Sequence, residues 1–186
     1  MIIVPTGLAE IRKTFGDPES YIREDGTVHP NWEHHTQGIL ELPAPLPLGW
    51  DHSVTVRRIR IHYRLLSSLG KILDTISRNG DWNKIATFDG TYNWRAKRRG
   101  HKLSTHAWGI AIDLNAATNQ LGTDGDMPLE IIKPFEDEGW KWGGDFRTKD
   151  PMHFQACFGY TILLSIAGGV VYGILSAIGS LTGAVA

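Results

Sequence analysis

The feature that most constrains the fold is a helical pattern of apolar residues between positions 56 and 78. Such spacing is typical of an amphipathic helix with one buried face. Leucine and isoleucine recur there at helical spacing, with arginine and lysine between them, at Ile59, Leu65, Leu66, Leu69, Ile72, Leu73 and Ile76. Asn79 and Gly80 follow, and glycine suits the end of a helix. We therefore predict one long helix over 56–78.

Short strand-like segments follow this helix. They are KIATFDG at 84–90, GIAIDLN at 109–115, KWGGDF at 141–146 and MHFQACF at 152–158, with turns and a short helix around 129–138 between them. The first fifty residues are instead rich in proline, glycine and turn formers, and PAPLPLGW at 43–50 is typical of an extended connector. The pattern predicts an α+β fold with a small antiparallel sheet, and an N-terminal region, 1–55, that wraps around the domain.

Composition narrows the chemistry that the chain can use. A chain of 186 residues with a formal charge of −1 fits one domain, and its charge favours neither nucleic acid nor an anionic membrane as the main partner. Its single cysteine, Cys157, excludes an intramolecular disulfide and a cysteine-based zinc site. The basic run at 95–102 is therefore interpreted as a solvated face, since nucleic-acid binding through it would require a steep salt dependence. A metal site here needs histidine and carboxylate ligands.

The two ends of the sequence indicate where in the cell the protein is made and located. Residues 160–186 contain no charged side chain, and their number is enough to span a bilayer core of ~30 Å. Glycine and serine weaken this signal, but Gly169/Gly173 and Gly179/Gly183 form two small-xxx-small pairs that favour helix packing in membranes. We expect one domain over 1–159 and an apolar transmembrane or membrane-associated helix over 160–186, with a core helix as the alternative. The N-terminus lacks the apolar region of a secretory signal, so we expect synthesis in the cytoplasm.

The segment STHAWGIAID at 104–113 carries the most informative chemistry. If 109–115 is a strand, Ile110 and Ile112 point to one face and Asp113 to the other. A carboxylate fixed on a mostly apolar strand costs free energy unless a cation or hydrogen bonds compensate it. His106 precedes Gly109, where the chain can bend, so its imidazole can reach the same point as Asp113. These two residues are candidate metal ligands.

A second segment, DPMHFQ at 150–155, shows the same pattern. His153 alternates with Met152 and Phe154, so it stands on the face opposite these apolar side chains. Two histidines and one aspartate leave a fourth position for water, which is the layout of a catalytic zinc site, and bound zinc lowers the pKa of water to about 7. Asp150, held three residues before His153 by the rigid Pro151, is the candidate general base.

Other polar and aromatic residues have plainer interpretations. A lone histidine or aspartate near a strand is more often a satisfied polar residue than a ligand, and Cys157 is more often a small buried hydrophobe. Trp108, Trp140 and Trp142 are expected in the core or in cleft walls. The remaining histidines are expected at the surface or in packing: His29, His34, His35, His52, His62 and His101. The guanidinium of Arg95 is a candidate clamp for a substrate carboxylate.

These residues resemble a family of zinc peptidases that includes D-alanyl-D-alanine carboxypeptidases of the vancomycin-resistance type and phage L-alanyl-D-glutamate endolysins. Residues 104–113 match the family pattern S-x-H-x-x-G-x-A-x-D in full, residues 150–154 match D-x-x-H-F, and WGGD at 142–145 resembles a segment of phage members. The likeness spans roughly 7–158, with the motifs in 91–158. The resemblance implies a zinc DD-peptidase-like fold, with His106, Asp113 and His153 as zinc ligands.

By the same resemblance, Asp150 is the catalytic base, and Arg95 and Ser104 correspond to substrate-contacting positions. The implied function is hydrolysis of peptidoglycan stem peptides, as in a phage or prophage L-alanyl-D-glutamate endopeptidase that degrades the cell wall. A D-alanyl-D-alanine carboxypeptidase is the alternative within this class. A non-catalytic wall-binding or structural phage protein is the alternative outside it. Many phage members carry a separate wall-binding domain, and here the apolar tail stands in its place.

Overall fold

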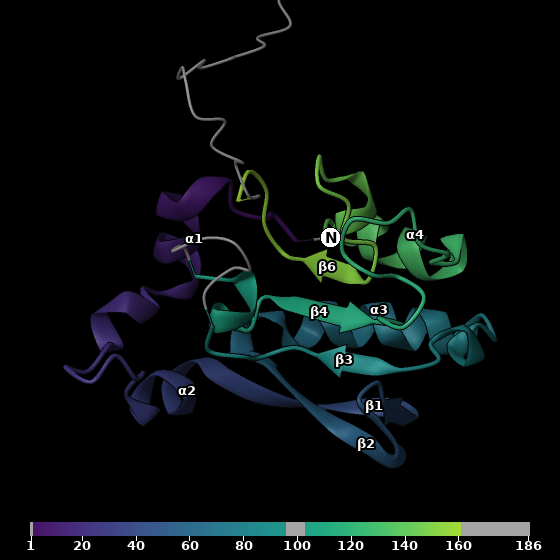
Figure 1. Ribbon diagram of the computed structural model, residues 1–186, viewed down its shortest axis with the longest axis horizontal. Helices are drawn as coiled ribbons and strands as arrows, with labels where there is room; N and C mark the ends of the chain where they lie inside the picture. Colours follow the sequence, from purple (N-terminus) through teal and green to yellow (C-terminus); the bar gives the residue numbers. More distant parts are fainter. Residues whose placement is uncertain (1, 96–102, 161–186) are drawn as a thin grey trace, which may run out of the picture.

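The fold is built on one mixed sheet, seen in a computed structural model that describes residues 2–95 and 103–160 (Figure 1). Six strands lie in the order β2-β1-β3-β4-β6-β5. Their bounds are Gln37–Leu48 (β1), Asp51–His62 (β2), Phe88–Gly90 (β3), Ala111–Leu114 (β4), Lys141–Trp142 (β5) and His153–Gln155 (β6). The α+β class is confirmed. The sheet is not wholly antiparallel, however, because β1 and β3 pair in parallel at Leu48 and Phe88.

Strands β1 and β2 form a long antiparallel hairpin that the sequence pattern did not predict. The predicted connector at 43–50 is largely the second half of β1, and residues 56–62 of the predicted helix belong to β2. Ile59 and Ile61 are buried and two residues apart, which is the period of a strand and not that of a helix. The pairing register shifts between Glu41 and Leu46, where prolines cannot donate ladder hydrogen bonds.

The predicted helix begins later than expected but ends where expected. After a 3-10 turn at Tyr63–Leu65, α3 runs from Leu66 to Arg78, and Gly80 follows its C-cap with a φ of 81°. In Figure 1, α3 lies behind the sheet. Its apolar face packs against the strands, with Leu69, Ile72, Leu73 and Ile76 at most 1% exposed. The short helix predicted around 129–138 is present as α4, Leu129–Asp137.

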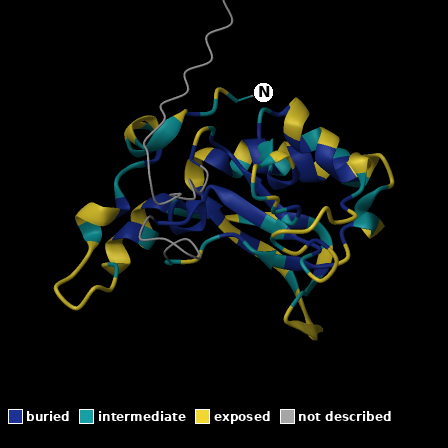
Figure 2. Cartoon of the chain, turned by 45° about the horizontal axis from the view of Figure 1, so that its top comes forward, coloured by how far each residue is buried: buried dark blue, intermediate teal, exposed yellow. Residues whose placement is uncertain are grey.

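Aromatic side chains complete the core on which the sheet rests. Trp108 and Trp140 are buried, and the indole Nε1 of Trp140 donates to Ser68 Oγ of α3 at 3.0 Å. Phe135 of α4 stacks on Phe154 of β6 with ring centroids 4.1 Å apart. Buried side chains accordingly concentrate in the sheet and on the inner sides of the helices, while the peripheral loops are exposed (Figure 2). Strands β4 and β6 therefore rest on a rigid, apolar base.

The N-terminal helices lie at the end of the sheet where the described chain also ends. They are α1, Gly7–Phe15, and α2, Pro30–Thr36. Phe158 exchanges backbone hydrogen bonds with this region, donating to Pro5 O at 2.8 Å and accepting from Gly7 N at 2.9 Å. Trp108 donates to Gly16 O at 2.9 Å. These bonds tie the beginning of the chain to residues near the site.

Part of the sequence lies outside the described residues. This holds for residues 161–186 of the membrane helix predicted over 160–186, and for most of the basic run, 96–102, with His101. Within 2–95 and 103–160, no helix combines the length and the apolar character needed to cross a membrane. Tyr160 is the last described residue, and its hydroxyl donates to Leu103 O at 3.1 Å.

Candidate metal centre

Two neighbouring strands and one turn bring His106, Asp113 and His153 together. Asp113 on β4 and His153 on β6 are direct partners in an antiparallel pair, and side chains of such partners project to the same face of a sheet. His106 belongs to a 3-10 turn, Thr105–Trp108, that precedes β4. Gly109 ends this turn with a φ of 67°, a left-handed conformation that glycine adopts without strain. The chain thus bends back over its own strand, as the sequence predicted.

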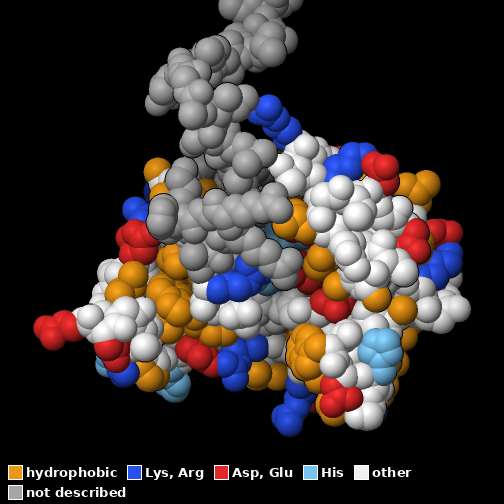
Figure 3. Space-filling view, in the orientation of Figure 1, with side chains coloured by type: hydrophobic (Ala, Val, Ile, Leu, Met, Phe, Trp, Pro, Cys, Tyr) orange, Lys and Arg blue, Asp and Glu red, His pale blue; other side chains and the backbone are white. Residues whose placement is uncertain are grey.

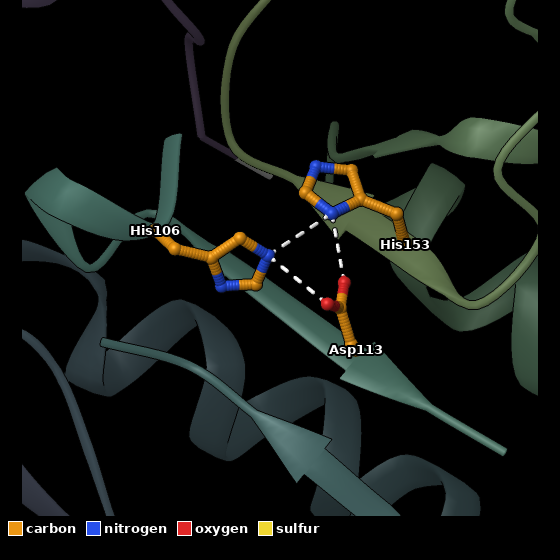
Figure 4. A group of neighbouring side chains, drawn as sticks. All are labelled: His106, Asp113 and His153. Atoms are coloured by element: carbon orange, nitrogen blue, oxygen red, sulfur yellow. Dashed lines mark hydrogen bonds and ion pairs between the residues drawn. The ribbon is translucent and has the colours of Figure 1, made fainter. Parts of the chain in front are cut away.

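The potential ligand atoms of these three residues face one another (Figure 4). Asp113 Oδ1 lies 2.8 Å from His153 Nδ1, and Asp113 Oδ2 lies 3.2 Å from His106 Nε2. The two imidazole nitrogens are 3.2 Å apart. Zinc bonds to such ligands are about 2.0–2.2 Å long, so the edges of a tetrahedral site measure about 3.3 Å. The donor types and their spacing therefore fit a zinc ion.

The outer nitrogens of both imidazoles have partners that fix the ring orientation. His106 Nδ1 lies 2.6 Å from the carbonyl oxygen of Thr91, which can only accept, so this nitrogen carries the proton. His153 Nε2 lies 3.2 Å from Gln155 Oε1 and 3.3 Å from Thr105 Oγ1. In the neutral form that binds a metal, a ring whose outer nitrogen donates presents an unprotonated nitrogen to the centre. Such outer hydrogen bonds are typical of metal-binding histidines.

Burial and the neighbouring charges have opposite effects on the pKa values of these residues. His106 and His153 are buried, and Asp113 is largely buried. Burial alone would raise the pKa of Asp113, but the charges and hydrogen bonds of the two histidines outweigh it and hold that pKa well below its usual range. Burial likewise opposes the charged form of His153, yet Asp113, with the charge of Asp150, raises the pKa of His153. The carboxylate is thus ionised, as a metal ligand must be.

A cleft opens beside the three residues and contains the other predicted functional side chains. Asp150, Arg95 and Ser104 line it together with His106, Asp113 and His153. Its apolar walls include Leu121, Phe146 and Met152. Among the described residues on the face seen in Figure 3, acidic and basic side chains are interspersed.

Asp150 reaches the cleft from a tight turn that leads into β6. His153 N donates to Asp150 O at 2.9 Å, which closes the turn, and Asp150 N donates to Gly143 O at 2.9 Å. A Cβ atom at Gly143 would lie 2.3 Å from Asp150 O, so a side chain there would displace this turn. The W-G-G-D segment is thus the backbone support of Asp150.

Ser104 and Arg95 also hold the backbone of the site. Ser104 Oγ accepts from His106 N at 3.4 Å and caps the 3-10 turn that bears this histidine. Ser104 N donates to Arg95 O at 3.0 Å. Both residues line the cleft, so their predicted contacts with substrate remain predictions that the geometry permits.

The sequence analysis did not identify three residues of the site as functional. Gln155 orients His153, and its position two residues further along the same strand face was the available signal. Thr91 acts through its carbonyl oxygen, for which no side-chain pattern exists. Arg147 also lines the cleft, but it is one of several charged residues between 145 and 150.

Several other residues have the packing roles that the sequence analysis predicted for them. Cys157 is buried and lies outside the ligand cluster, as expected of a small hydrophobe. His62 is buried in packing, with Nε2 donating to Phe15 O at 3.1 Å. Trp142 is half-buried and donates to Pro151 O at 2.8 Å, next to the turn of Asp150.

Comparison with known proteins agrees with this site. Residues 97–156 match the model of a family described as D-alanyl-D-alanine carboxypeptidase. The matched segment includes all three candidate ligands and Asp150. No curated protein and no solved structure gives a significant match to the chain. The segment that carries the candidate metal centre is therefore similar to this carboxypeptidase family, and the match covers about a third of the chain.

Proposed function

We propose that this protein is a zinc-dependent hydrolase of peptidoglycan stem peptides, and that it cuts the bond between L-alanine and D-glutamate. The observation that carries the proposal is the cluster of His106, Asp113 and His153 in one cleft with Asp150. Three protein ligands and an open side facing a cleft are the layout of a catalytic zinc site, whereas structural sites use four protein ligands. The family match supports the peptidase class.

Asp150 is the general acid and base in this proposal. Zinc, when bound, would lower the pKa of a coordinated water to about 7 and polarise the scissile carbonyl. The Asp150 carboxylate accepts the proton of the attacking water and then delivers it to the leaving amine, so one residue serves both halves of the reaction. Met152 and Phe146 line the cleft and limit the access of bulk water to these transfers.

Arginine side chains provide recognition of the substrate. Arg95 and Arg147 line the cleft, and a guanidinium binds a carboxylate through two parallel hydrogen bonds. Stem peptides carry free carboxylates beside their peptide bonds, which gives these arginines a matching partner. Arg95 is assigned to orient the carboxylate next to the scissile bond.

A D-alanyl-D-alanine carboxypeptidase is the second candidate, since the matched family bears that description. Its substrate also ends in a carboxylate that Arg95 can bind. The phage-type W-G-G-D segment at 142–145, which supports Asp150, favours the endopeptidase.

Mass analysis of peptidoglycan fragments tests the proposal. Purified peptidoglycan is digested with the full chain and with the Asp150→Ala variant as control. The proposal predicts new termini at L-alanine and D-glutamate with the full chain alone. Release of free D-alanine would identify a carboxypeptidase instead. Binding to peptidoglycan without any cleavage, by a zinc-loaded chain, would identify a non-catalytic wall-binding protein.

A further inference from the structure

A buried asparagine stands in the loop that connects β4 to α4. Asn119 is 0% exposed, and a buried amide is costly unless its polar atoms find partners. Its Nδ2 donates to Asp126 Oδ1 at 2.8 Å, to Thr118 Oγ1 at 3.0 Å and to Asn115 O at 3.1 Å. Its Oδ1 accepts from Asp126 N at 3.0 Å. The amide therefore holds both ends of the 115–126 loop together.

This loop is hydrogen-bonded through its backbone to the segment that carries Asp150. The backbone oxygen of Asn119 accepts from Met152 N at 3.1 Å, and Gly122 N donates to Lys149 O at 2.7 Å. These two hydrogen bonds lie on either side of Asp150 in the sequence. The Asn119 side chain thus fixes a loop whose backbone fixes the turn.

The opposite side of the turn is held by a different part of the chain. Gly143 O accepts from Asp150 N at 2.9 Å, and the indole of Trp142 donates to Pro151 O at 2.8 Å. On the loop side, Gly125 packs against the turn so closely that a Cβ atom there would lie 2.6 Å from Pro151 Cγ. The turn is clamped from two sides, and the clamp on the loop side depends on Asn119.

We propose that Asn119 is a positioning residue that sets where the Asp150 carboxylate lies in the cleft. Asn119 does not line the cleft, so it acts through the loop and the turn. The inference rests on the assignment of Asp150 as the general base. A base must lie within hydrogen-bond reach of the proton it accepts, and a misplacement of about 1 Å can reduce turnover about 100-fold.

The primary test is Asn119→Ala in the full, zinc-loaded chain. We expect kcat to fall between about tenfold and 100-fold, with KM within about twofold and one zinc still bound, because the ligands and the arginines stay in place. The decisive measurement is the double variant. Asn119→Ala should cost little in an Asp150→Ala background, because the residue that it positions is already gone. If Asn119 has a merely structural role, Asn119→Ala should lower kcat by the same factor in both backgrounds.

A second pair of variants keeps the test valid if Asn119→Ala does not fold. Gly125→Ala places a methyl group 2.5 Å from Asn119 Oδ1 and 2.6 Å from Pro151 Cγ, so it disturbs the same contact between loop and turn without removing the amide. Gly80→Ala is the matched control, since both glycines have positive φ, 66° and 81°, but a Cβ at Gly80 meets nothing within 4 Å. We expect kcat to fall in Gly125→Ala and to stay unchanged in Gly80→Ala.

The outcomes separate this inference from the proposed function. Full turnover in Asp150→Ala would remove the base assignment and, with it, the role of Asn119. If Asp150→Ala retains only a small residual turnover while Asn119→Ala is fully active, the inference alone is overturned. Gly125→Ala takes the place of Asn119→Ala in this comparison if Asn119→Ala does not fold. Equal fold losses in the presence and absence of Asp150 would also overturn it and reduce Asn119 to a stabilising residue.

Discussion

Asp113 and His153 face each other across the antiparallel pair of β4 and β6, and the carboxylate Oδ1 lies 2.8 Å from the imidazole Nδ1. Because they are directly paired, the separation of these two side chains depends on the ladder and not on a loop. His106 joins them from a turn that a left-handed glycine and the Ser104 cap hold in place. The candidate ligand set is therefore pre-organised, which lowers the entropy cost of binding a metal.

The outer hydrogen bond of His153 should matter for zinc affinity. We expect Gln155→Leu to weaken zinc binding about 10-fold to 100-fold, because such a partner fixes the tautomer and orientation of a metal-binding imidazole. Competition with a chelator of known affinity measures this effect. Gln120→Leu, at an exposed position, is the control and should bind zinc as the unaltered chain does. Equal affinity in both variants would show that Gln155 does not support the metal site.

Arg95 should contribute to substrate use through the shape of its guanidinium. We expect Arg95→Lys to lower kcat/KM on the order of tenfold, because a point charge replaces a planar two-donor group. Steady-state kinetics on a purified stem peptide provides the measurement, with zinc content checked in parallel. Arg147→Lys is the matched variant in the same cleft. If only Arg147→Lys lowers kcat/KM, the carboxylate contact belongs to Arg147.

His62 should make the folded state sensitive to mild acid. Burial, together with the charge of Arg64, outweighs the hydrogen bond to Phe15 O and lowers the pKa of His62 from 6.5 to about 4. Between these values the unfolded chain binds a proton that the folded chain does not, so stability falls as pH drops from about 6.5 to about 4. The shift corresponds to about 3 kcal/mol.

Urea denaturation from pH 4 to pH 7 tests this with His62→Gln, which keeps a donor for Phe15 O. The variant should show a flatter pH dependence of the free energy of unfolding in that window. Protonation of the metal ligands affects both proteins equally, so the difference between the two curves isolates His62. Parallel curves would assign the acid sensitivity to other groups.

Residues 161–186 provide a separate prediction about location. We propose that this uncharged stretch tethers the enzyme to a membrane. The full chain should sediment with membranes and resist extraction by high salt, which removes electrostatically bound proteins. A chain that ends at Tyr160 should stay in solution and remain active, since Tyr160 Oη still bonds Leu103 O. If the shortened chain unfolds while the full chain is soluble, the tail belongs to the core.

The sequence predicted the elements whose periodicity is unambiguous. The strand at 111–114, the helix at 129–137 and the end of α3 before Gly80 lie where expected. Residues 56–62 were misassigned because the helical pattern that begins near Leu65 was extended back to Ile59, whereas Ile59 and Ile61 have the spacing of a strand that pairs with β1. Proline-rich β1 was missed because a register shift lets its prolines avoid ladder bonds.

For the candidate site, side-chain patterns were enough to predict that the three candidate ligands and Asp150 lie close together. The supports of these residues were not predictable in the same way. Thr91 acts through a backbone oxygen, and the asparagine that braces the turn of Asp150 is remote from it in sequence. Such contacts arise from the tertiary arrangement of loops, which local pattern and spacing do not encode.

The most direct test of the central claim is the activity of the full chain as a function of bound zinc. The protein is stripped with a chelator, zinc is added back in measured amounts, and cleavage of stem peptides is followed by mass analysis. The account predicts no cleavage by the stripped protein and a linear rise that ends at about one zinc per chain. His106→Ala should neither retain the zinc nor recover activity at that ratio. Full cleavage by metal-free protein would contradict the account.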